Sequence, residues 1–138
     1  MRGAIRLILD GLRTPDAHGR DWWAWWAGQM AHALIGLLLA ALLFAWLGDA
    51  WIAAGLGAAI YAVGKEVPDG LRERSQRGWR DAAHDALFVA AGAVLAAALL
   101  LQDWRAFAVA FVAGGTGLII GVMQRARAAL RATNAEGT

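Results

Sequence analysis

The chain has 138 residues, of which 59% are hydrophobic and 17% are charged, and its mean hydropathy is +0.46. This composition excludes a soluble domain of the same size, which needs more polar surface to cover its core. There is no cysteine, which excludes disulfides and thiolate chemistry. The formal net charge of +2 is too small to argue for a nucleic-acid partner.

Residues 1–20 are predicted to form an amphipathic segment at the membrane surface. Charged residues interrupt the apolar ones throughout the first 13 residues, which excludes a cleavable signal peptide. The apolar residues recur at helical spacing, and Pro15 ends the pattern. A frayed terminus remains the alternative. The apolar positions are Met1, Ala4, Ile5, Ile8, Leu9 and Leu12.

The first apolar run has no charged residue between Asp21 and Asp49. It opens with WWAWW, residues 22–26, which is typical of an aromatic belt at the membrane–water boundary. A stacking platform for nucleic acid or sugar is the less favoured interpretation. We expect the first membrane helix at 30–47, followed by a turn at Gly48 and Asp49.

Three further apolar runs follow, and together the four runs predict an all-α polytopic membrane protein with four transmembrane helices. Run 50–64 is short for a span, so we expect it to continue to Val67 until Pro68 limits it. Run 82–101 is expected to begin with His84 and Asp85 in its first turn, and the last run covers 106–123. The transmembrane domain is therefore predicted at 21–124, and 125–138 is predicted to be a basic cytoplasmic tail without regular structure past Arg131.

The basic residues predict the orientation. With four spans and both termini inside, every one of the 13 Lys and Arg residues except Arg105 lies on the cytoplasmic side. Rows of small residues four apart also predict close helix packing, within the chain, with a second copy or with a larger membrane complex. These rows are Ala54/Ala58, Gly55/Ala59, Gly92/Ala96 and Ala113/Gly117/Gly121.

Ionisable residues gather at the predicted cytoplasmic helix ends. The candidate ligand- or lipid-binding residues are His32, Lys65, Glu66, Asp69, Arg80 and His84, and the candidate metal ligands are Glu66, Asp81 and Asp85. Like-charged carboxylates on one helix face repel unless a cation or a proton relieves them. A divalent cation, Lys65 or an arginine would each do so.

Structural roles remain open beside these functional ones. Asp81 and Asp85 at a helix start suit the helix dipole, and His32 can bond to a neighbouring helix. No phosphate-binding loop and no H-E-x-x-H motif is present, and Ser75 is the only serine. Whether the protein is an enzyme stays open.

One pattern of residues is His32, then Tyr61-x-x-x-Lys65-Glu66-x-x-Asp69, then Trp79-x-Asp81-x-x-x-Asp85 with Gly92. This pattern resembles the VanZ-like group, and in particular its YfiM-like branch. The resemblance covers about residues 30–96. It implies a small multi-helix protein of the bacterial inner membrane, with a polar signature at His32, Glu66, Asp81 and Asp85, but it supplies no biochemical activity. Asp85 departs from the pattern, since VanZ-like proteins often have Asn there.

The convergence of these polar groups on one boundary predicts a site that binds a phosphate-bearing lipid or a lipid-linked cell-envelope precursor, either directly or through a divalent cation as an optional cofactor. In this hypothesis, His32 or His84 is a ligand or proton carrier, and Lys65 or Arg80 faces the phosphate. Membrane lipids are the expected partners. A non-catalytic subunit of a larger membrane complex, or a phage-type protein such as a holin, is the alternative.

Overall fold

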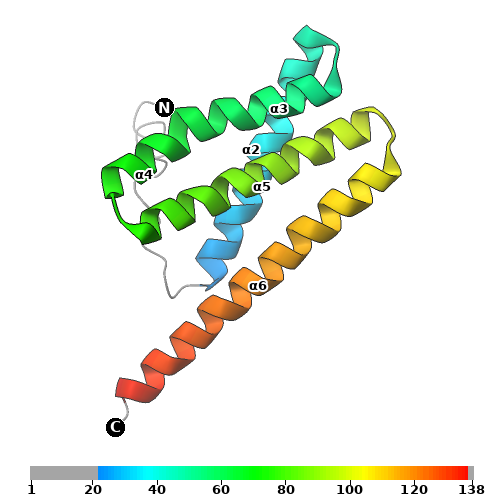
Figure 1. Ribbon diagram of the computed structural model, residues 1–138. Helices are drawn as coiled ribbons and strands as arrows, with labels where there is room; N and C mark the ends of the chain where they lie inside the picture. The colour runs from blue at the N-terminus through cyan, green and yellow to red at the C-terminus, as the bar shows by residue number, and fades with distance from the viewer. Residues whose placement is uncertain (1–21, 137–138) are drawn as a thin grey trace, which may run out of the picture.

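The computed structural model describes residues 22–136, and all regular structure in this range is helical. The predicted surface segment at 1–20 lies outside the described residues. Figure 1 shows the long helices crossing one another as a bundle. The elements are α2 (Trp22–Leu47), α3 (Ala50–Tyr61), a π-helical turn η1 (Ala62–Glu66), α4 (Val67–Glu73), α5 (Gln76–Leu100) and α6 (Trp104–Glu136).

Among the described residues, 3 helices are long and apolar enough to cross a membrane, at Trp22–Leu47, Gly78–Leu100 and Trp104–Arg131. These helices are compatible with a membrane location, and the chain is a helical protein with transmembrane character. The second apolar run of the sequence lies on α3, which has only 12 residues before the π-helical turn. A fourth span is therefore not established by length and composition.

The turns between helices are closed by capping residues that the sequence supplies. Gly48 has a φ of 69°, a left-handed conformation that glycine adopts without strain. Asp49 then accepts hydrogen bonds at 3.0 Å from the backbone of Trp51 and Ile52 and so caps α3. Ser75 caps α5 through Gly78 N at 2.9 Å, and Asp103 caps α6 in the same way.

Helix boundaries differ from the prediction at three places. The second helical segment does not stop at Pro68. The proline directly follows the π-helical turn, and α4 continues the helix through it. Helix α5 begins at Gln76, so Asp85 lies in its third turn rather than its first. Helix α6 continues to Glu136, so the basic tail is helical past Arg131.

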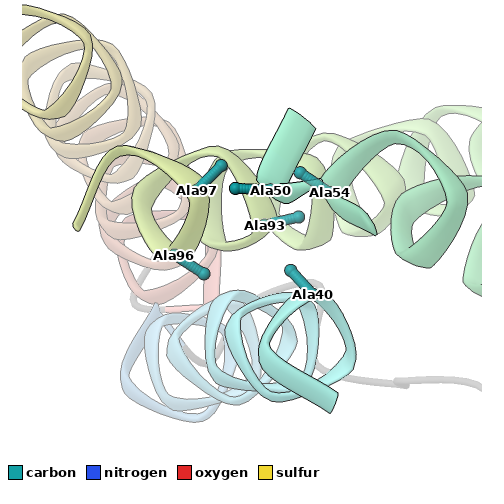
Figure 2. Close-up of a cluster of buried hydrophobic side chains, with 6 residues drawn as sticks. All are labelled: Ala40, Ala50, Ala54, Ala93, Ala96 and Ala97. Carbon is teal, nitrogen blue, oxygen red and sulfur yellow. The ribbon is translucent and has the colours of Figure 1, made fainter. Parts of the chain in front are cut away.

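The centre of the bundle is built from alanines. Ala40 of α2, Ala50 and Ala54 of α3, and Ala93, Ala96 and Ala97 of α5 are buried together, and Leu37 and Phe44 pack against them. Figure 2 shows the six alanine side chains lying between the three helices. Small side chains let the helix backbones approach closely, as membrane helices do.

Two glycines bring α2 and α5 into backbone contact. A Cβ atom at Gly36 would overlap the carbonyl group of Val89, and a Cβ atom at Gly92 would overlap the carbonyl group of Ala33. The predicted small-residue rows are used in part: Ala54, Gly92 and Ala96 are buried between helices, whereas Gly55 faces open space. The α2–α5 crossing is thus fixed by glycine on both sides.

Candidate functional site

His32, Glu66 and Asp85 form the one group of at least three His or carboxylate side chains within metal-ligand range among residues 22–136. One ligand atom of each lies within 4.8 Å of the others. The side chains of Glu66, His32 and Asp85 are only 5%, 10% and 15% exposed. We call these three residues the HED cluster; they come from η1, α2 and α5.

The glycine crossing places two members of the HED cluster. His32 lies one helical turn before Gly36 on α2, and Asp85 lies one turn before Val89 on α5. Because Gly36 and Val89 touch backbone to backbone, the preceding turns also face each other. The His32 Nδ1 atom is accordingly 3.6 Å from Asp85 Oδ1.

The π-helical turn places the third member. Tyr61 and Glu66 are five residues apart, and in a regular α-helix their side chains would point about 140° away from each other. A π-helical turn has its hydrogen bonds between residues five apart, and here Val67 N bonds to Ala62 O. Glu66 is consequently buried on the bundle side, and the Tyr61 ring lies edge to face with His32, with ring centroids 5.8 Å apart.

Gln29 belongs to the site, although the sequence analysis did not select it. Its side-chain Nε2 donates a hydrogen bond of 2.7 Å to Asp85 Oδ1. The residue is only 1% exposed, yet its Oε1 is buried without a hydrogen-bond partner among the described residues. Its signal in the sequence is a lone amide three residues before His32, on the same helix face, within a charge-free run.

Lys65 and Asp69 connect the HED cluster to the surface. The Lys65 Nζ atom lies 3.2 Å from Glu66 Oε1 and 3.2 Å from Asp69 Oδ2. Asp69 in turn lies 3.4 Å from the exposed guanidinium of Arg72. Glu66 is buried, Lys65 and Asp69 are half-buried, and Arg72 is exposed. Side-chain exposure therefore increases along this series of ion pairs toward the surface.

The structure does not bring the other predicted site residues into the HED cluster. Asp81, one turn nearer the end of α5 than Asp85, lies 3.6 Å from Arg125 of α6. His84 is exposed, and its Nδ1 lies 2.7 Å from the carbonyl oxygen of Arg80 in its own helix. Arg80 is exposed as well. Asp81 shares a helix face with Asp85 but meets a different neighbouring helix.

The WWAWW segment divides between two environments. Trp22 and Trp23 are exposed, as an interfacial belt requires, but Trp25 is buried against Phe88 and below the guanidinium of Arg125, which lies 4.0 Å from a Trp25 ring centroid. Trp25 was predicted to belong to the belt. It is instead in the bundle because it lies four residues before Gln29, on the face of α2 that packs against α5 and α6.

The HED cluster lies deeper than the helix ends. His32 is about 15 Å along α2 from Trp22, and Asp85 is about 14 Å along α5 from Gln76, at a rise of about 1.5 Å per residue. Asp85 was expected in the first turn of its helix, at the membrane boundary. It instead lies, like His32, within a helix segment that is apolar enough to span a membrane, where ionisable residues are costly and usually functional.

The donor set determines what chemistry is available. One imidazole nitrogen and two carboxylates suit Mn²⁺, Zn²⁺ or Mg²⁺, and an amide oxygen is an additional hard ligand. Imidazole and carboxylate side chains can also accept and donate a proton.

Comparison with known proteins does not extend these observations. No protein-family model matches the chain, and neither a curated protein nor a solved structure matches it. The VanZ-like resemblance therefore stays a prediction from the residues listed above, and function is argued from the site.

Proposed function

We propose that this protein is an integral membrane protein that binds a divalent cation at the HED cluster. The observation that carries the proposal is the convergence of three largely buried ligand side chains, with Glu66 the most buried, from three helical elements to within 4.8 Å. Two carboxylates at this separation in a low-dielectric bundle repel each other strongly, and a cation between them removes the repulsion.

Gln29 supports a cation rather than a simple ion pair. Its Nε2 group holds the amide beside Asp85, and its buried Oε1 has no partner among the described residues. A buried acceptor without a hydrogen bond costs about 1–3 kcal/mol. A cation, or a water molecule bound to one, would offset this cost.

The proposal includes four spans with both termini in the cytoplasm. Helices α3 and α4 and the π-helical turn follow one another without a break from Ala50 to Glu73. At about 1.5 Å per residue this segment is about 36 Å long, enough to cross a hydrocarbon core of about 30 Å. This topology leaves Arg105 as the one basic residue outside, and the VanZ-like resemblance favours the inner membrane of a bacterium.

Thermal unfolding of the protein purified in an uncharged detergent tests cation binding. We expect Mn²⁺ or Zn²⁺ to raise the unfolding temperature, because a ligand present at 100 times its Kd stabilises the folded state by about 2.7 kcal/mol. Glu66→Gln and Asp85→Asn should abolish the rise. Their matched controls, Glu73→Gln and Asp81→Asn, change carboxylates outside the HED cluster and should retain it.

The proposal fails if wild-type protein gains no stability from Mn²⁺, Zn²⁺ or Mg²⁺, or if the control variants lose the gain equally. A non-catalytic subunit of a membrane complex, or a holin-like protein, would then be the better assignment. Helix α6 supports that alternative, since it exposes a series of large apolar side chains. These are Val109, Phe111, Val112, Ile119 and Ile120.

A further inference from the structure

The ion pairs around Lys65 are balanced in charge. The carboxylates of Glu66 and Asp69 face two cations, Lys65 and Arg72. A divalent cation bound by Glu66 adds positive charge to this balanced set, and an anion is then attracted.

We propose that the bound cation switches Lys65 from an internal counter-ion to a ligand for the phosphate group of a lipid. Without the cation, Lys65 Nζ is held between Glu66 Oε1 and Asp69 Oδ2, each at 3.2 Å. When Glu66 binds the cation, Lys65 loses one of these partners. Asp69 keeps Arg72 as an alternative partner at 3.4 Å, so Lys65 can turn to an external anion.

The surroundings of Lys65 favour a lipid over free phosphate. Lys65 is half-buried, and the large apolar side chains beside it on the same helical segment, Val63 and Val67, are exposed. In a membrane these side chains contact acyl chains. The long, flexible lysine side chain can extend toward the headgroup region while its methylene groups stay in apolar surroundings.

This inference rests on the proposed cation site and adds a definite coupling to it. If the cation increases affinity for the lipid phosphate, the lipid must increase affinity for the cation by the same factor. Coupling between two sites is typically about 5- to 150-fold. A phosphomonoester lipid such as phosphatidic acid is the suitable probe, since it presents an accessible phosphate that Lys65 and a cation can bind together.

Native mass spectrometry of the full chain in an uncharged detergent tests the coupling. Phosphatidic acid is added with and without Mn²⁺, phosphatidylcholine is the headgroup control, and inorganic phosphate tests the free anion. We expect Mn²⁺ to increase retention of phosphatidic acid by at least about 5-fold in the wild type. Lys65→Gln should lose the increase in phosphatidic acid retention but still bind Mn²⁺, and Lys65→Arg should restore part of the increase. Arg80→Gln removes an exposed cation outside the site and should behave as wild type.

The outcomes separate the two proposals. If the wild type binds none of Mn²⁺, Zn²⁺ and Mg²⁺, both are overturned. If it binds Mn²⁺ but phosphatidic acid is retained equally without it, or equally by Lys65→Gln, only the lipid inference falls. Equal competition by inorganic phosphate would overturn the lipid as the ligand. Phosphatidic acid can also bind Mn²⁺ without the protein site. The Glu66→Gln variant measures this contribution, because it lacks the protein site while the lipid is unchanged.

Discussion

The two halves of the α2–α5 interface differ in the kind of side chain that they bury. Toward the Leu47 end of α2, the contact surface is alanine, and every group there stabilises the bundle by close packing. Toward the Trp22 end, the same two helices bury Gln29, His32 and Asp85. Burying such groups does not by itself stabilise a protein. The alanine half therefore maintains the fold, and the proposed cation site lies in the polar half.

The largest effect is expected from breaking the glycine contact between the two halves. Gly36→Leu forces a side chain into the carbonyl group of Val89, and helices α2 and α5 must separate. We expect a loss of about 3 kcal/mol or more in the free energy of unfolding, measured by titration with SDS in mixed micelles. Cation binding should be lost as well, because His32 and Asp85 no longer meet.

Gly55→Leu is the matched control for Gly36→Leu, since a Cβ atom at Gly55 has no neighbour within 4 Å. It should change stability by less than about 0.5 kcal/mol. If the two variants were equally destabilised, the close crossing of α2 and α5 would be contradicted.

A smaller loss is expected within the alanine half. Ala97 is fully buried, and Ala97→Leu should cost about 1–3 kcal/mol through overpacking. Ala59→Leu lies on the exposed side of α3 and should be nearly neutral. Cation binding by the folded Ala97→Leu variant should be retained, since Ala97 lies three turns from Asp85; loss of the site would show that the two halves are not separable.

The smallest change in the free energy of unfolding is expected in the polar half, where the substitution should stabilise the protein. Asp85→Asn keeps an acceptor for Gln29 Nε2 and removes one of two neighbouring carboxylates. Without cation we expect a gain of about 1 kcal/mol in stability, as is common when a functional site loses its charge. Asp81→Asn, whose carboxylate is half-exposed and pairs with Arg125, should instead lose up to about 1 kcal/mol. Destabilisation by Asp85→Asn in the absence of cation would indicate a structural ion pair.

Several parts of the fold follow from local sequence alone. The turn at Gly48 and Asp49 was predicted, and the structure gives its physical reason: Gly48 has a positive φ, and Asp49 caps the next helix. The continuation past Pro68 was not predicted, because it depends on a π-helical turn that no local propensity indicates. Glu66 and Asp85 were selected from their charge, but their meeting with His32 depends on how far along the helices the glycine contact lies.

The sequence by itself determined that this is an all-helical protein suited to a membrane, because unbroken apolar runs and terminal capping residues act over one or two helical turns. Only the tertiary structure decided that His32, Glu66 and Asp85 meet while Asp81, His84 and Arg80 do not. The physical reason is that a helix presents several faces, and which face meets which neighbour is set by backbone contacts at Gly36 and Gly92, far apart in the chain.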